Sequence, residues 1–262
     1  TDLQAVRAAV TPETKLLYIE TPSNPMLGIT DIASIVNIAK EVGALTFLDN
    51  TFMTPIHQRP LDLGVDVVIH SATKFLSGHS DIVAGLVVTK DPTLSEQVYF
   101  IQNSFGSCLG VQDSFTLIQN MKTTAVRFNE SARVASVLAT FLDNHPLVEK
   151  VYYPGLASHP GADIHARQST SAGAVLSFSL PSYDVAKVFV EAMQIPVFAV
   201  SLGGVESILS YPAKMSHAAM EPEERAKRGI TDGLLRFSVG LENEHDLLED
   251  FAQALEKALQ VK

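Results

Sequence analysis

Polar side chains that could do chemistry follow three apolar runs in the first part of the chain. Asn24, Asp49 and the stretch Ser71–Lys74 each come shortly after such a run. In an open α/β sheet, ligands bind at the carboxyl ends of the strands, so these positions are candidates for one shared site. Taken singly, each is more typical of a turn residue or a solvated lysine. Their combination favours a ligand site.

An amine, a carboxylate and hydroxyl groups together suit pyridoxal phosphate (PLP). This cofactor needs a lysine amine for covalent attachment and a carboxylate that keeps its pyridine nitrogen protonated. It also needs hydrogen-bond donors for its phosphate. Lys74 supplies the amine, Asp49 the carboxylate, and Ser71 and Thr73 part of the phosphate site. A desolvated pocket would favour the deprotonated amine that attachment requires.

The elements expected to position these residues alternate between strand and helix. Thr30 and Asp31 are candidate N-caps of a helix with apolar residues at helical spacing, and Gly43 follows as a candidate C-cap. The other runs are short and apolar, as in strands covered on both faces. The expected strands are 16–20, 44–48, 65–69 and 86–89. This part therefore predicts a three-layer α/β domain over residues 1–129.

In the second half of the chain, the sequence pattern no longer alternates regularly between strand and helix. The segment 111–142 lacks Gly and Pro and is periodic at helical spacing, so it predicts one or two helices. Further strands are expected at 148–153, 174–180 and 235–239, with helices at 184–193 and 244–259. Strands mixed with flanking helices predict a smaller α+β domain over residues 130–262.

Composition excludes several classes of function. The chain has 262 residues, is 46% hydrophobic and carries a formal net charge of −10, which argues against a nucleic-acid partner. No apolar run approaches a membrane span, and no secretory leader is visible. The lone Cys108 excludes an internal disulfide and fits a reducing compartment. We expect a cytoplasmic protein with a small-molecule ligand, no membrane partner and no metal site.

Several motifs resemble one enzyme family. The stretch Val65–Ser80 is similar to the PLP-attachment signature of the Cys/Met-metabolism enzymes, which include cystathionine β- and γ-lyases, cystathionine γ-synthase and methionine γ-lyase. The other matching stretches, in the family's order, are 20–25, 48–52, 152–156, 201–207 and 235–240. The resemblance covers essentially the whole chain. It implies the PLP-dependent transferase fold of type I, with a three-layer α/β/α large domain followed by a smaller α+β C-terminal domain.

The resemblance also implies roles for individual residues. Lys74 would attach the cofactor and move protons, and Asp49 would pair with the pyridine nitrogen. Ser71 and Thr73 would bind the phosphate. Asn24 would lie near the ring oxygen and the substrate carboxylate.

The remaining roles concern the substrate. Arg236 would clamp the carboxylate with its planar fork, helped by Ser201. Glu206 matches a family position near the distal end of the substrate, although a structural role is an equal alternative. His217 falls in a stretch that borders the family's active site.

Part of the family pattern is not found in this sequence. The aromatic ring that stacks on PLP and a glycine-containing phosphate loop lie upstream of the attachment lysine in the family. The chain begins at Thr1, and too few residues precede Lys74 to hold them. We therefore expect a large domain truncated at its N-terminus, with weak cofactor affinity unless the upstream part is present.

Within the family, the stretch 208–235 is most similar to cystathionine lyases of Gram-positive bacteria, some of which cleave both C–S bonds. The expected activity is β-elimination from cystathionine, giving homocysteine, pyruvate and ammonia, with γ-elimination to cysteine and 2-oxobutyrate as a close second. Cystathionine γ-synthase and methionine γ-lyase remain alternatives. An aminotransferase and a non-catalytic fragment are alternatives of other classes. The resemblance implies a homotetramer built as a dimer of dimers.

Overall fold

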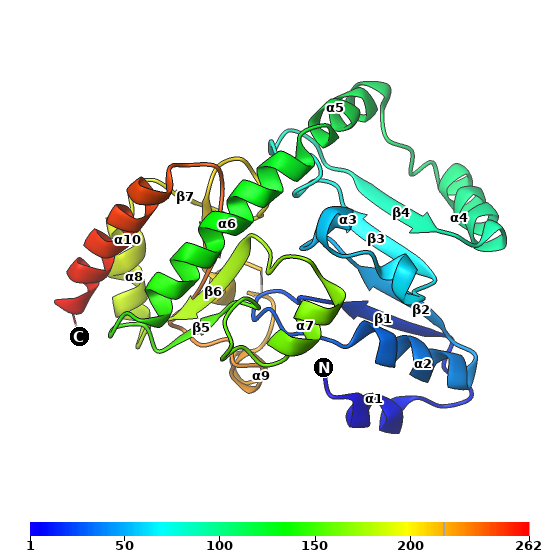
Figure 1. The fold of residues 1–262 in the computed structure, drawn as a ribbon, viewed down its shortest axis with the longest axis horizontal. Coiled ribbons are helices and arrows are strands. Elements are labelled where there is room, and N and C mark those ends of the chain that lie inside the picture. The colour runs from blue at the N-terminus through cyan, green and yellow to red at the C-terminus, as the bar shows by residue number, and fades with distance from the viewer. Residues whose placement is uncertain (217, 262) are drawn as a thin grey trace. The chain divides into compact units, whose positions relative to one another are not determined.

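The computed structural model describes residues 1–216 and 218–261. These residues form two compact units, each assembled from separate stretches of the chain (Figure 1). Unit 1 consists of residues 1–23, 28–124 and 163–171. Unit 2 consists of residues 24–27, 125–162 and 172–262. No helix in the described part of the chain is both long and apolar enough to cross a lipid bilayer.

Unit 1 is built on a four-stranded sheet in the order β1-β2-β3-β4. The first three strands are parallel, and β4 pairs antiparallel with β3. The strands are β1 (Leu16–Glu20), β2 (Leu45–Asp49), β3 (Val67–Ser71) and β4 (Gly85–Thr89). The helices are α1 (Leu3–Ala9), α2 (Ile32–Val42), α3 (Thr54–His57), η1 (Pro60–Leu63), α4 (Pro92–Phe105), α5 (Val111–Met121) and most of α7 (Ala162–Gln168).

Helix α2 forms where its capping residues predict. The Asp31 carboxylate accepts a hydrogen bond from Ser34 N at 2.9 Å, and Gly43 ends the helix with a φ of 71°. The buried face of α2 packs with Leu48 and Val68 of the sheet. A distant segment also holds the start of this helix, because Gln168 Oε1 accepts a hydrogen bond from Ile32 N at 3.2 Å. This packing fixes β2 and β3 beneath α2.

The expectation of strands covered on both faces, made for the runs 44–48, 65–69 and 86–89, was wrong for the edge strand β4, and the other edge strand, β1, is also partly exposed. Tyr18 in β1 is 55% exposed and Val87 in β4 is 50% exposed. Strand β3 also begins two residues later than the predicted run, because Val65 lies in a turn where its N–H donates to Pro60 O. The shift places Ser71 at the end of the strand.

Unit 2 is built on a five-stranded sheet in the order β5-β6-β9-β8-β7. Its strands pair antiparallel except for the parallel pair β7 and β8. The strands are β5 (Lys150–Tyr152), β6 (Val175–Ser179), β7 (Val197–Phe198), β8 (Ile208–Ser210) and β9 (Leu234–Ser238). The helices are α6 (Thr124–Asp143), whose first residue belongs to unit 1, α8 (Tyr183–Ala192), η2 (Pro212–Lys214), α9 (Pro222–Lys227) and α10 (Glu244–Leu259).

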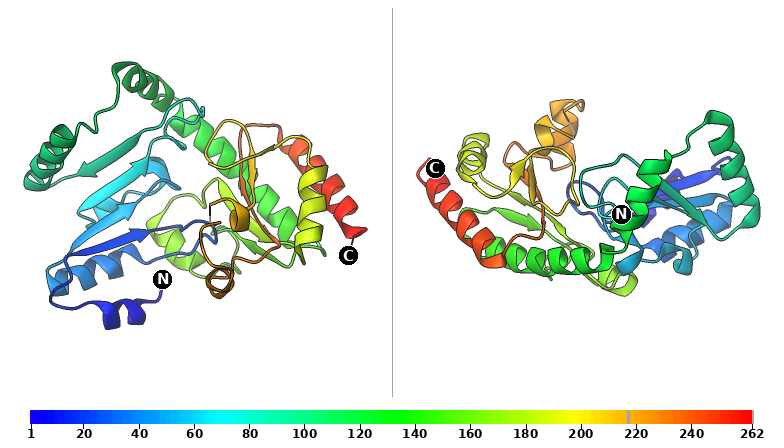
Figure 2. Two further views of the ribbon diagram at one scale, coloured as in Figure 1. Left: turned by 180° about the vertical axis from the view of Figure 1, so that it is seen from behind. Right: turned by 90° about the horizontal axis from the view of Figure 1, so that it is seen from above.

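One face of this sheet carries the core of unit 2. Side chains from α6, α8 and α10 share a buried apolar cluster with Leu235 and Phe237 of β9. Helices α8 and α10 lie side by side in every view (Figure 2), and the rings of Phe237 and Phe251 pack edge to face at 4.9 Å. Because side chains alternate along a strand, Arg236 and Ser238 point to the opposite face. The sheet therefore has an apolar face and a face with polar groups.

Candidate active site

In unit 1, Asp49 and Ser71 lie at the carboxyl ends of the adjacent parallel strands β2 and β3. Thr51 connects them. Its backbone N–H donates to Asp49 Oδ1 at 2.9 Å, and its hydroxyl oxygen accepts from Ser71 N at 2.8 Å. The second carboxylate oxygen of Asp49 accepts no hydrogen bond from any residue that the structure describes. It can therefore accept one from a ligand.

Lys74 lies in the turn that follows β3. Its N–H donates to Ser71 O at 3.2 Å, and Gly78 N donates to Lys74 O at 2.7 Å. The side chain of Lys74 is half-buried. These two hydrogen bonds fix the backbone of Lys74 in the turn, three residues after Ser71, the last residue of β3.

Ser71 and Thr73, whose hydroxyl groups are expected to bind the phosphate, differ in the hydrogen bonds that these hydroxyls make. Thr73 Oγ1 accepts from Ala84 N at 2.9 Å and donates to Ala84 O at 3.3 Å, so its single proton is used on the backbone. The hydroxyl of Ser71 makes no hydrogen bond within the described residues. Ser71 is thus the better placed donor of the two, and the phosphate role of Thr73 stays a prediction.

His70, which precedes Ser71 in β3, is buried. Burial lowers the pKa of its imidazole below the ordinary value, and the nearby charge of Asp49 opposes this shift only in part. Its Nδ1 has no hydrogen-bond partner in the part of the chain that the structure describes. A neutral imidazole therefore borders the Asp49 carboxylate.

These groups match the chemistry of PLP. The set holds an amine at Lys74, a carboxylate with an open oxygen at Asp49, and a hydroxyl donor at Ser71. An aldehyde, a pyridine nitrogen and a phosphate are the groups that such a set would take. The residues present in unit 1 therefore fit the cofactor that the sequence predicts.

In unit 2, Arg236 is 3% exposed, and within the described part of the chain its guanidinium donates hydrogen bonds to neutral groups only. Nη1 donates to Asn24 Oδ1 at 2.9 Å, and Nη2 donates to Ser201 O at 2.5 Å and to Ser210 Oγ at 3.1 Å. Burial lowers the pKa of Arg236 to about 10. Nε has no hydrogen-bond partner among residues 1–216 and 218–261. A buried cation without an anion is costly, which indicates a site for an anionic ligand.

The loop that begins at Ser201 is held in an unusual conformation. Ser201 has a φ of 83°, a backbone region that is costly for a residue other than glycine. Gly203 N donates to Ser238 Oγ at 2.8 Å, and the Ser207 N–H and hydroxyl both donate to the Glu242 carboxylate, at 2.6 and 2.7 Å. These bonds fix the carbonyl of Ser201 on Arg236. Ser201 thus contacts Arg236 through its backbone oxygen, and its predicted role in binding the substrate carboxylate stays a prediction.

Two glycines, Gly240 and Gly204, allow the close packing of the rest of this loop. A Cβ on Gly240 would lie 2.4 Å from Ser207 N and Val205 O, so only glycine fits there. Glu206 is half-buried in the same loop, and its carboxylate lies 3.0 Å from the place where a Cβ of Gly204 would be. The substrate role predicted for Glu206 stays a prediction. His217 lies outside the described residues.

In unit 1 the structure links Asp49 and Ser71 through Thr51 and places Lys74 in the turn after Ser71, and in unit 2 it brings together Asn24, Ser201 and Arg236. Sequence reasoning missed two residues. Thr51 was detectable, because Asp-Asn-Thr after a strand is a typical turn in which an Asp side chain accepts the N–H two residues on. Ser210 gave no such signal, since an isolated serine in a strand is common.

The chain matches known proteins over nearly its full length. The sequence model of the family "Cys/Met metabolism PLP-dependent enzyme" matches residues 1–256. Cystathionine beta-lyase MetC of Bacillus subtilis is 62% identical over 98% of this chain and 66% of its own length. Cystathionine gamma-lyase of the same organism is 48% identical over 97% of this chain and 67% of its own length. The chain spans about two thirds of the length of these curated relatives.

Solved structures agree with the sequence comparison. Cystathionine gamma-lyase from Lactobacillus plantarum, complexed with L-serine, matches with a TM-score of 0.96 at 45% identity, over 98% of this chain and 68% of the other. Cystathionine gamma synthase from Xanthomonas oryzae pv. oryzae, in complex with cystathionine, matches with a TM-score of 0.98 at 44% identity, over 100% of this chain and 68% of the other. These likenesses confirm the predicted type of fold. The chain belongs to the Cys/Met metabolism PLP-dependent enzyme family.

Proposed function

We propose that the protein is a PLP-dependent carbon–sulfur lyase that cleaves cystathionine by β-elimination. Cystathionine and water would yield homocysteine, pyruvate and ammonia. The observation that carries the proposal is Arg236, a buried guanidinium whose protein partners are all neutral and whose Nε is left without a partner by the described residues. An α-amino-acid carboxylate supplies the missing anion and can accept hydrogen bonds from the planar fork.

The cofactor would be held by unit 1. Lys74 provides the amine for attachment, Asp49 keeps a proton on the pyridine nitrogen, and Ser71 donates its hydroxyl hydrogen to the phosphate. When bound, PLP withdraws electrons from the bonds at the substrate Cα and so acidifies the Cα proton. Lys74 would then remove this proton, and as the Cβ–S bond breaks it would donate a proton to the sulfur of the leaving homocysteine.

The acid beside the ring is itself positioned by its neighbours. Thr51 N fixes Asp49 Oδ1 at 2.9 Å, which leaves Oδ2 as the open oxygen for a ring N–H. The buried, neutral imidazole of His70 adds no positive charge that would compete for this carboxylate. Both features support a role for Asp49 as an ionised partner of a protonated nitrogen.

In unit 2, substrate binding depends on a site that is formed in advance. Asn24 Oδ1, Ser201 O and Ser210 Oγ hold the two terminal nitrogens of Arg236, so its plane is set without a ligand. A carboxylate held by this fork cannot rotate freely. Its orientation would restrict which Cα bond is broken.

The named relatives support the choice of bond. Cystathionine β-lyase is the name of the relative at 62% identity, which favours β-elimination. The relative at 48% identity is a cystathionine γ-lyase, so γ-elimination to cysteine and 2-oxobutyrate is the second candidate. γ-Replacement, as in cystathionine γ-synthase, is the third.

The proposal extends to the setting of the enzyme. We propose a cytoplasmic homotetramer built as a dimer of dimers. The single cysteine, which is exposed and unpaired, supports a reducing compartment. Gel filtration with light scattering would test the assembly, and a dimer or monomer would contradict it.

Product analysis on cystathionine tests the function. The full-length protein loaded with PLP is incubated with cystathionine, and the thiols and keto acids are separated. Homocysteine with pyruvate supports β-elimination. Cysteine with 2-oxobutyrate would replace it with γ-elimination, and no keto acid at all would refute a lyase.

Two pairs of variants test the residues. Lys74→Ala should abolish turnover, whereas Lys90→Ala, a change in a solvent-exposed ion pair with Asp62, should not alter it. Arg236→Ala should lower kcat/KM by about 30-fold or more, from the 2–5 kcal/mol typical of a buried charged contact. Arg228→Ala, which removes only an exposed pair with Glu224, is its control. Full activity in Lys74→Ala would refute the mechanism.

A further inference from the structure

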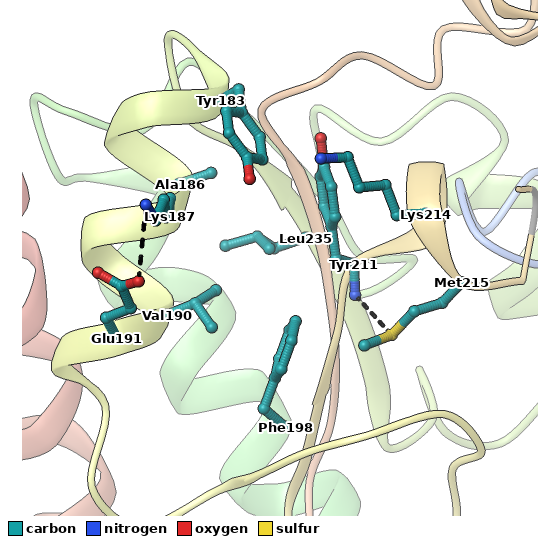
Figure 3. A pocket seen from close by; sticks show the side chains of 10 residues that line it. All are labelled: Tyr183, Ala186, Lys187, Val190, Glu191, Phe198, Tyr211, Lys214, Met215 and Leu235. Atoms are coloured by element: carbon teal, nitrogen blue, oxygen red, sulfur yellow. Dashed lines mark hydrogen bonds and ion pairs between the residues drawn. The ribbon is translucent and has the colours of Figure 1, made fainter.

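Unit 2 contains a cavity that the proposed reaction does not use. It has a volume of about 450 Å³, within the range of small-molecule sites, and lies between α8, η2 and the strands β7 and β9. Figure 3 shows its lining, with Tyr183 and Lys214 at one end and Phe198 at the other. Val190, Tyr211 and Leu235 line the space between them.

This cavity is separate from the carboxylate site. Leu235 lines it, and Leu235 and Arg236 are consecutive residues of β9 whose side chains point to opposite faces of the sheet. Neither Arg236 nor Asn24 is among the residues that line it. A ligand bound here would therefore occupy the apolar face of the sheet, away from the guanidinium.

The walls of the cavity suit a flat apolar group. The rings of Tyr183 and Tyr211 lie 5.9 Å apart between centroids, and Phe198, which is 49% exposed, faces the space from β7. Val190 of α8 and Leu235 of β9 provide aliphatic surface that borders the space in Figure 3. Aromatic side chains prefer offset or edge-on contacts with another ring, which would add to the burial of apolar area.

Two lysines, Lys187 and Lys214, and one carboxylate, that of Glu191, line the cavity. Lys187 and Glu191 pair with each other on α8 at 3.9 Å and so offset one another. Lys214 forms no ion pair with any described residue. Its Nζ lies over the Tyr183 ring, 4.3 Å from the centroid. The Tyr183 hydroxyl beside it makes no hydrogen bond within the described residues. One cation and one hydroxyl donor therefore stand together at one end of an apolar cavity.

We propose that this cavity binds an aromatic monocarboxylate, with its ring against Val190 and Leu235 and its carboxylate at Lys214 and Tyr183. The apolar walls select the ring, because its burial removes apolar area from water. The ammonium of Lys214, which has no carboxylate partner among the described residues, selects one negative charge. A neutral analogue of the same shape would keep the free energy from burial of the ring and lose the attraction between its carboxylate and the Lys214 ammonium.

The test compares 2-naphthoate with its neutral isostere, 2-naphthamide, on the full-length protein loaded with PLP. Ligand-observed NMR titrations give the two dissociation constants. For a ligand of this size we expect a Kd of about 1 mM for the acid. The amide should bind about two- to fivefold more weakly, which is the range of an exposed ion pair. Equal affinities for acid and amide would overturn the proposal.

Two variants locate the site. Val190→Trp fills the cavity and should abolish binding of both ligands, whereas Val126→Trp adds the same group at an exposed position of α6 and should change neither. If acid binding survives in Val190→Trp, the ligand binds elsewhere, for example at Arg236, and the proposal fails.

A charge variant tests the role of the ammonium. Lys214→Met should remove the preference for the acid over the amide while leaving amide binding unchanged, because the aliphatic stem is kept. Lys257→Met, on the exposed side of α10, is the matched control and should keep the preference. An undiminished preference in Lys214→Met would overturn the assignment of the carboxylate to this residue.

Discussion

Thr51 offers a sharp test of how the cofactor residues are held. Its hydroxyl oxygen is the acceptor for Ser71 N at 2.8 Å, while its own backbone N–H serves Asp49. Thr51→Val replaces the hydroxyl by a methyl group of similar shape and leaves the backbone bond to Asp49 in place. The change therefore removes one acceptor only.

The expected size of the effect follows from what is left behind. Thr51 is buried and Ser71 is half-buried, so the Ser71 N–H loses its acceptor where water reaches it poorly. An unsatisfied backbone donor of this kind costs about 1–2 kcal/mol. We expect the free energy of unfolding to fall by this amount. PLP affinity should fall as well, since the Ser71 hydroxyl sits on the same residue.

Urea denaturation followed by circular dichroism measures the stability, and titration of the apoprotein with PLP, followed by absorbance, measures the affinity. Thr51→Ser is the control, because it keeps the hydroxyl and should retain most of the stability and most of the PLP affinity. A Thr51→Val protein that matches the wild type in both measurements would refute the reasoning.

Two further predictions concern other parts of the structure. Gly240→Ala should destabilise the protein by about 1–3 kcal/mol through overpacking, because the new Cβ would lie 2.4 Å from Ser207 N. Gly85→Ala is the control and should not destabilise it, because the nearest atom to its Cβ would be 3.7 Å away. Equal urea midpoints for the two variants would contradict this. The lowered pKa of His70 means that the unfolded state binds a proton first as the pH falls below about 6.5. Stability should then be unchanged above that pH and decline below it, and a His70→Asn variant should show a smaller decline between pH 7.5 and 5.5.

Local signals in the sequence predicted α2, α8 and α10 well, whereas the 14-residue helix α4 and the short helices α1, α3, α7 and α9 were not predicted. Helix α2 begins and ends at the capping residues Asp31 and Gly43, and α10 has the predicted bounds, 244–259. Capping and amphipathic periodicity act over one or two turns, so a single sequence carries them. The break between α5 and α6 was left open as one or two helices. It falls at residues 122–123.

Contacts between distant residues were harder to predict. The direction of β4 depends on its pairing with β3, and no local pattern encodes it. The hydrogen bond from Arg236 to Asn24 joins residues 212 positions apart. Asn24 was identified from its place after an apolar run and Arg236 by family resemblance, and sequence spacing holds no information on the contact between them. The hydrogen bonds between the Thr73 hydroxyl and the backbone of Ala84 were missed for the same reason.

The segment 163–171 has a practical consequence for anyone who wishes to divide this molecule. It follows unit 2 residues along the chain but belongs to unit 1, where Gln168 bonds to both Thr30 O and Ile32 N, and Ser169 donates to Gln58 Oε1. A fragment cut after residue 124 would lack these bonds and expose the first turn of α2. Separate expression of either half, or a circular permutation that severs this stretch, should therefore give a poorly folded product.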